Sequence, residues 1–210
     1  MKYVLCILIG YLMGSINPSY IIARLRGFDI REKGSQNAGA SNALILFGKV
    51  IGIGCALFDI AKATLAIWLC GKLFPGLAYS FAVTGMACIF GHTFPFYMRF
   101  KGGKGLACLG GMILAFDWRV FLIMLAAEIV VAIVTDYICF VPLTASAVFP
   151  IVYGVLHRDV WGALILALLL PLMLYKHREN LKRIKQKTEM PFSFLWNKDK
   201  ALAKTNIPRE

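Results

Sequence analysis

The segment RFKGGKG at residues 99–105 combines three cations with three glycines, directly before an apolar run. Lys101 and Lys104 flank Gly102 and Gly103, so ammonium groups and exposed backbone amides can converge on one anion. A helix that begins here directs the positive end of its dipole at the same point. The pattern predicts a phosphate-binding loop. It is not a Walker A sequence, because GxxxxGK followed by Ser or Thr does not occur in it. The alternative is a basic membrane anchor with a glycine hinge.

A second segment, GSQNAGASNA at residues 34–43, carries short polar side chains in a glycine-rich stretch. Ser35 and Asn37 supply hydroxyl and amide groups, and the glycines let the backbone approach a ligand. This composition suits a polyol or a polyanion. The simpler interpretation is a flexible loop in which Asn42 caps the start of a helix.

A third segment, YKHRENLKRIKQKTE at residues 175–189, continues an apolar run into a basic one. On a helix, His177, Asn180 and Arg183 share one face because they are three residues apart. That face presents an imidazole, an amide and a guanidinium at the membrane surface. A basic amphipathic helix that lies on anionic lipid is the competing interpretation.

The elements that position these segments follow from the composition. Of 210 residues, 59% are apolar and only 16% are charged, and the mean hydropathy is +0.70, which excludes an ordinary soluble domain. A transmembrane helix needs about 20 predominantly apolar residues. Full-length or shorter candidates occur at residues 4–23, 50–69, 77–97, 105–116, 120–134, 137–156 and 160–175. We predict an all-α integral membrane protein with seven transmembrane helices, one domain over residues 1–189 and a basic cytoplasmic tail at 190–210.

The distribution of basic residues predicts the orientation, because Lys and Arg favour short loops on the cytoplasmic side. Most of the 23 Lys and Arg residues lie on one side of the predicted bundle, in segments 24–49, 99–104 and 176–209. The opposite side carries Lys2, Lys72, Arg119 and Arg158. The N-terminus is thus predicted outside and the C-terminus in the cytoplasm, where most of the net charge of +12 faces anionic lipid or anionic substrates. We expect no nucleic-acid partner, because the basic residues belong to membrane loops without a stacking motif.

Ionisable residues within the predicted spans favour a different class of function. Asp59 and Lys62 are three residues apart and can pair on one helix, while Glu128 needs a partner or a proton. Such groups couple ions in transporters, so they are the best sequence evidence for a transport protein. The six cysteines stand singly in apolar runs. We expect them to pack as small hydrophobes, with no disulfide framework and no metal site.

The segments GSQNAGASN, GHTFPFYMRFKGGKG and HRENLKR followed by TE, in this order, closely resemble the acyl-phosphate:glycerol-3-phosphate acyltransferase family, PlsY. The resemblance runs from residue 14 to about residue 189. It implies a seven-helix, multi-pass enzyme of the bacterial cell membrane whose active site faces the cytoplasm. Such an enzyme moves a fatty acyl group from acyl phosphate to the 1-hydroxyl of glycerol 3-phosphate. Lysophosphatidic acid and phosphate are the products, and the expected partners are these substrates and membrane lipid, with no cofactor.

The resemblance also implies roles for particular residues. Ser35 and His177 are expected nearest the chemistry, as catalytic residues, with a histidine base and an acyl-serine intermediate both left open. The substrate-binding residues it implies are Asn37, Gly102, Gly103, Lys104 and Asn180. Among these, the amides of Gly102 and Gly103 are expected to hold the oxyanion of the transition state.

Five positions depart from the family pattern. Gln36, Ala63 and Lys187 stand where a glycine is usual, and Ser41 replaces a threonine. Ile45 replaces an arginine, and a missing guanidinium at a polyanion site costs about 1.5 to 3 kcal/mol. Two alternatives therefore stay open: a divergent paralogue with another phosphorylated acceptor, and a non-catalytic protein that binds or transports an anionic lipid or solute.

Overall fold

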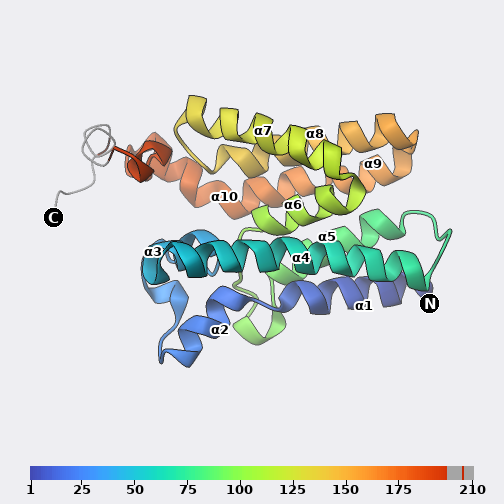
Figure 1. Ribbon diagram of the computed structural model, residues 1–210, viewed down its shortest axis with the longest axis horizontal. Helices are drawn as coiled ribbons and strands as arrows, with labels where there is room; N and C mark the ends of the chain where they lie inside the picture. The colour runs from blue at the N-terminus through green and yellow to red at the C-terminus, as the bar shows by residue number, and fades with distance from the viewer. Residues whose placement is uncertain (198–204, 206–210) are drawn as a thin grey trace.

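The computed structural model describes residues 1–197 and residue 205, and its regular elements within them are all helical (Figure 1). The α-helices are α1 (Lys2–Ser15), α2 (Pro18–Leu25), α3 (Ala40–Phe47), α4 (Lys49–Leu73), α5 (Ser80–Thr93), α6 (Leu106–Phe116), α7 (Trp118–Thr135), α8 (Phe140–His157), α9 (Val160–Ala167) and α10 (Leu169–Lys185). Three short 3-10 helices are η1 (Ile30–Glu32), η2 (Phe96–Met98) and η3 (Phe192–Leu195). Most of the predicted tail at 190–210 lies outside the described residues.

Each of the seven predicted membrane segments coincides with helix, but the first is not one continuous span. Its two parts, α1 and α2, are bent by 41° at a short break. Pro18 begins α2, and a proline disfavours helical conformation in the residue before it. The Asn17 side chain caps α2 by accepting a hydrogen bond from the Tyr20 amide, with an N–O distance of 2.9 Å. The break leaves the Ile16 carbonyl free to bind a side chain from another helix.

Four segments of the described chain are long and apolar enough to cross a bilayer, namely α4, α7, α8 and the continuous stretch Val160–Lys185. The bent α1–α2 pair makes a fifth if it is counted as one span. Helices α5 and α6, with 14 and 11 residues, are shorter. Large apolar side chains on these helices, such as Ile123 and Val134 of α7, point outward and are exposed, as a lipid-facing surface requires.

Small residues let the central helices approach closely. A Cβ atom added to Gly14 of α1 would lie 2.0 Å from the Cys88 carbonyl oxygen of α5, and one added to Gly111 of α6 would lie 2.2 Å from the Ile60 carbonyl oxygen of α4. Such contacts are the usual way in which helices associate in lipid. Helix α3 and the end of α10 lie at one end of the molecule, and the N-terminus and the α4–α5 connection lie at the other (Figure 1).

The three ionisable residues that the sequence places within predicted spans, Asp59, Lys62 and Glu128, each have a polar partner. Lys62 Nζ lies 2.6 Å from Asp59 Oδ1 on the same helix and donates to the Ile16 carbonyl at the α1–α2 break, also at 2.6 Å. Thr144 of α8 donates to Glu128 of α7 at 2.6 Å. The predicted pairing of Asp59 with Lys62 is confirmed. All six cysteines are buried, as expected for small hydrophobic side chains.

Candidate active site

The RFKGGKG loop folds back along the end of α5. The Gly102 amide donates to the Thr93 carbonyl and the Gly103 amide to the His92 carbonyl, each at 3.1 Å. A Cβ atom at Gly103 would lie 2.1 Å from His92 Nε2, so this approach requires a glycine. Because both amides already have carbonyl partners, the prediction that they hold an oxyanion is wrong for this conformation. The glycines shape the loop instead.

Free amides lie just beyond these glycines, where α6 begins. Gly105 is the N-cap residue with φ +91°, and the first cap hydrogen bond runs from the Leu109 amide to its carbonyl at 2.8 Å. Within the described residues the amides of positions 104–108 have no hydrogen-bond partner, as expected for the first turn of a helix. Together with the helix dipole, they form a better anion site than the glycine amides.

Lys104 is directed at the third motif. Its ammonium donates to the Asn180 side-chain oxygen, and Asn180 in turn donates to Glu189 at 2.5 Å. Arg183 also donates to Glu189, at 2.5 Å. Burial is the main reason why the pKa of Lys104 lies below its ordinary value. Sequence reasoning joined Lys104 with Asn180 in one site but missed that Glu189, in the TE pair, orients the amide.

His177 lies one turn before Asn180 on α10 and is only 4% exposed. Its Nδ1 is 2.9 Å from the Met173 carbonyl oxygen. A carbonyl only accepts, so Nδ1 carries the proton and Nε2 is left with a lone pair in the neutral ring. A backbone carbonyl thus orients the ring, where sequence reasoning looked for a carboxylate.

The loop that carries Ser35 and Asn37 is braced from within. Asn42 is fully buried; its oxygen accepts from the Ser35 amide at 2.8 Å, and its nitrogen donates to the carbonyls of Ile30 and Lys33 at 2.8 and 3.0 Å. The alternative in which Asn42 caps a helix is wrong, because α3 begins after Gly39 without a side-chain cap. Ser35 is exposed and Asn37 is half-buried, so both side chains can meet a ligand.

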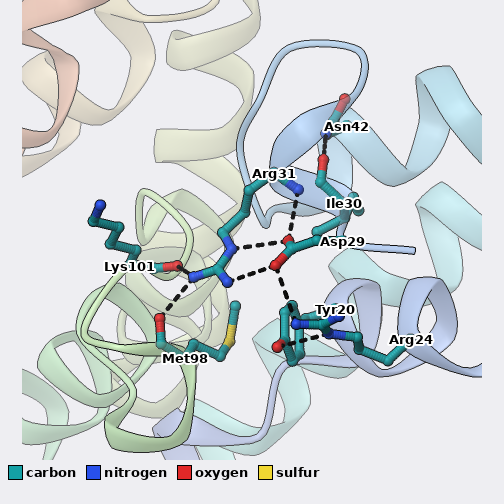
Figure 2. Close-up of polar contacts among 8 residues, drawn as sticks. All are labelled: Tyr20, Arg24, Asp29, Ile30, Arg31, Asn42, Met98 and Lys101. Atoms are coloured by element: carbon teal, nitrogen blue, oxygen red, sulfur yellow. Dashed lines mark hydrogen bonds and ion pairs between the residues drawn. The ribbon is translucent and has the colours of Figure 1, made fainter. Parts of the chain in front are cut away.

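Contacts across the break between α1 and α2 bring the two loops together. The Asn17 side-chain nitrogen donates to the Ala38 carbonyl at 2.7 Å, and the Asn17 backbone amide donates to the Tyr97 hydroxyl at 3.2 Å. Arg31 donates to the carbonyls of Met98, at the end of η2, and of Lys101, in the RFKGGKG loop, which is called the second loop because it follows the Ser35–Asn37 loop in the chain (Figure 2). Residues on either side of Ser35 and Asn37, namely Arg31 and Ala38, are thereby linked to the segment that leads to Lys104. Within the described residues no hydrogen bond joins Ser35 to His177.

A cluster of potential metal ligands lies under the second loop. One ligand atom each from Asp59, His92 and Cys108 lies within 4.8 Å of the others, and all three residues are buried. Lys62 Nζ lies 2.6 Å from Asp59 and 3.1 Å from His92 Nδ1, so an ammonium already neutralises the site. We interpret the cluster as a structural support of the loop.

Comparison with known proteins fits this arrangement. The family model described as "Glycerol-3-phosphate acyltransferase" matches residues 4–187. The chain belongs to this family. It is similar to glycerol-3-phosphate acyltransferase 1 of Oceanobacillus iheyensis, with 39% identity over 94% of this chain and 99% of the relative. It is also similar to the glycerol-3-phosphate acyltransferase of Bacillus subtilis, with 33% identity over 93% of this chain and 100% of the relative.

Solved structures in the family confirm the fold. The crystal structure of PlsY (YgiH), an integral membrane glycerol 3-phosphate acyltransferase, in its glycerol 3-phosphate form has a TM-score of 0.84 and 29% identity over 93% of this chain and 98% of that one. Its lysophosphatidic acid form has a TM-score of 0.82 and 28% identity over 93% and 97%. The predicted family, the membrane fold and the acyltransferase class in phospholipid biosynthesis are thereby confirmed.

Proposed function

We propose that the protein transfers a fatty acyl group from acyl phosphate to the 1-hydroxyl of glycerol 3-phosphate, and that lysophosphatidic acid and phosphate leave. The observation that carries the proposal is the direct bond from Lys104 to Asn180, one turn from His177, beside the free amides of α6. Both substrates bear phosphate, and a partly buried cation next to a helix N-terminus binds phosphate and screens the repulsion between two of them.

Each predicted site residue has a role in this scheme. Lys104 and Asn180 bind phosphate oxygens, while Ser35 and Asn37 bind the phosphate or glycerol hydroxyls from the neighbouring loop. Gly102 and Gly103 act through the close approach that they permit. The first-turn amides of α6 stabilise the oxyanion, the role that was first expected of the glycine amides.

The chemistry then needs one proton acceptor. His177 Nε2 takes the proton of the 1-hydroxyl as its oxygen attacks the acyl carbon, and the tetrahedral intermediate expels inorganic phosphate as the carbon–oxygen bond breaks. Phosphate leaves without general-acid help. Within the described residues Ser35 Oγ has no hydrogen bond to a base, which supports direct transfer rather than an acyl-serine intermediate.

We further propose that residues 1–189 form a single catalytic domain that crosses the bacterial cell membrane seven times, with the N-terminus outside and the site and tail in the cytoplasm. The short helices α5 and α6 complete the seven crossings by packing in the centre of the bundle, where protein rather than lipid surrounds them. The segregation of basic residues to the end that carries α3 and the end of α10 supports this orientation.

The test is an assay of the purified protein in lipid with palmitoyl phosphate and glycerol 3-phosphate, in which phosphate and lysophosphatidic acid are both measured. We expect phosphate release that depends on the acceptor and that Lys104→Ala abolishes. A folded wild-type protein that releases no phosphate with this acceptor contradicts the proposal.

The alternative of a paralogue with another phosphorylated acceptor rests on one substitution, Ile45 in place of the arginine that the family resemblance implies. Ile45, at the position of the family arginine, is 60% exposed, so an arginine fits there without steric cost. If the absent guanidinium limits acceptor binding, Ile45→Arg lowers KM for glycerol 3-phosphate in the same assay. An unchanged KM means that the site binds glycerol 3-phosphate without a guanidinium at position 45.

A further inference from the structure

The Arg31 side chain connects the first loop, between α2 and α3, with the second loop, the RFKGGKG segment after α5. The Arg31 guanidinium donates to both oxygens of Asp29, from Nε at 2.9 Å and from Nη2 at 2.6 Å. Its remaining nitrogen, Nη1, donates to the carbonyl oxygens of Met98 at 2.6 Å and Lys101 at 3.2 Å. Figure 2 shows the guanidinium between Asp29 on one side and the two carbonyls on the other. The planar fork of an arginine suits this four-bond arrangement, whereas a lysine has one point charge and three donors.

On each loop, the residues that Arg31 connects lie close in the sequence to a predicted site residue. On the first loop, the Ile30 carbonyl accepts from Asn42, and Asn42 also binds the Ser35 amide. On the second loop, Lys101 precedes the glycines that lead to Lys104. Arg31 and Lys101 are 70 positions apart in the sequence, so this bond fixes the relation between two distant motifs.

The second loop also needs an external support. Arg99 and Phe100 are consecutive non-glycine residues with φ values of 53° and 57°. Left-handed backbone costs such residues about 1 to 2 kcal/mol each, and it persists where surrounding contacts determine it. The two carbonyls that Arg31 binds, at Met98 and Lys101, lie on either side of this strained turn.

A neighbouring arginine provides a comparison. Arg24 also binds Asp29, at 3.4 Å, and both guanidinium carbons lie over the Tyr20 ring at similar distances, 5.1 Å for Arg24 and 5.2 Å for Arg31. Arg24 also donates to the Tyr20 hydroxyl, so both of its side-chain partners lie within residues 20–29 and neither belongs to the second loop (Figure 2). Its side chain is 53% exposed, compared with 20% for Arg31.

We propose that Arg31 is a positioning residue for acyl transfer, which holds the Ser35–Asn37 loop in register with the loop that carries Lys104. It acts through the backbone of the second loop rather than by touching substrate. The inference rests on the proposed function, because a loss of register matters only if both loops act on the same pair of substrates.

The experiment compares Arg31→Met with Arg24→Met, which removes a guanidinium from the same carboxylate. Kinetics with palmitoyl phosphate and glycerol 3-phosphate are measured in lipid, at a temperature where thermal unfolding shows each variant to be folded. Hydrogen exchange of the peptide covering residues 99–105 is measured without substrate. Should Arg31→Met fail to fold, Arg31→Lys and Asp29→Asn replace it; Asp29→Asn keeps the acceptor that binds the Arg31 amide at 3.0 Å.

We expect Arg31→Met to lower kcat/KM by about ten- to a hundredfold, because small misplacements of binding groups have effects of this size. Exchange at residues 99–105 rises in the same variant. Arg24→Met leaves kcat/KM within about twofold, since exposed ion pairs contribute little, and leaves exchange unchanged. An equal loss in Arg24→Met, or a loss in Arg31→Met without faster exchange, overturns the proposal; the latter result indicates direct contact with substrate. Wild-type activity in the same assay tests the proposed function separately, and the exchange measurement does not depend on it.

Discussion

Substitution of Gly103 by alanine tests whether the phosphate loop is held against the His92 ring. The new Cβ atom would lie 2.1 Å from Nε2 and 2.8 Å from Cε1, about 1.3 Å short of the 3.4 Å at which ordinary contact begins. The ring cannot easily move away, because it is 3% exposed and Nδ1 lies 3.1 Å from Lys62 Nζ and 3.5 Å from Asp59. The loop must therefore shift by about 1 Å, and Lys104 shifts with it.

A displacement of this size at a binding group lowers kcat/KM by about a hundredfold. The cost in stability is smaller, about 1 to 3 kcal/mol, as for other overpacked sites. The control is Gly110→Ala on α6, where the nearest atom to an added Cβ is a Phe121 ring carbon at an ordinary 3.6 Å. This control keeps wild-type activity and gains the higher helix propensity of alanine.

The assay is acceptor-dependent phosphate release in lipid, together with thermal unfolding of each variant. The double variant Gly103→Ala with His92→Ala removes the steric overlap. We therefore expect its loss of stability to be smaller than the sum of the losses in the two single variants. Wild-type activity in Gly103→Ala, or an equal loss in Gly110→Ala, refutes the argument that the loop is held by this contact.

Three further changes test other parts of the structure. Because burial lowers the pKa of Lys104, its charge is lost at a lower pH than that of a free lysine; KM for glycerol 3-phosphate should rise below the pH at which an ordinary lysine titrates, and Lys104→Arg should remove the rise. Lys187 has φ 56° at a position where glycine is usual in the family, so Lys187→Gly should raise the free energy of unfolding by up to about 1 kcal/mol, seen as a higher Tm without loss of activity. Lys62→Met leaves Asp59 buried without its ammonium and should destabilise the protein by about 3 to 5 kcal/mol; the added change Asp59→Asn should recover much of the lost Tm.

The sequence allowed the helices and the three motifs to be predicted because both depend on local patterns. Apolar runs specify helices in lipid, and each predicted segment is helical, although the first is divided into α1 and α2 and the last includes α9 and the start of α10. Asn17 followed by Pro18 is also a local signal, a cap before a helix-starting proline, and it could have predicted the break in the first span. Gln36 and Lys187 both have φ 56°, a backbone conformation that favours glycine, the residue that the family resemblance implies at these two positions.

The partners of the site residues could not be predicted, because they come from distant segments or from the backbone. The carbonyls that occupy the Gly102 and Gly103 amides belong to α5, and nothing in the loop sequence specifies that it folds back on them. Glu189 reaches Asn180 only because the chain reverses after α10, through the left-handed backbone at Lys187. The contact from Arg31 to the second loop likewise joins positions 70 residues apart in the sequence.

The buried charges that favoured a transporter in the sequence have a local explanation in the structure. An ion-coupling group must exchange its partner during transport. Lys62, however, binds Asp59, His92 and the Ile16 carbonyl together, and so joins α4 to the end of α5 and to the α1–α2 break. The His92 carbonyl then binds Gly103 in the phosphate loop. A fixed internal cation thus neutralises Asp59 and supports the RFKGGKG loop through His92, so the pairing of Asp59 with Lys62 has a structural explanation that does not require transport.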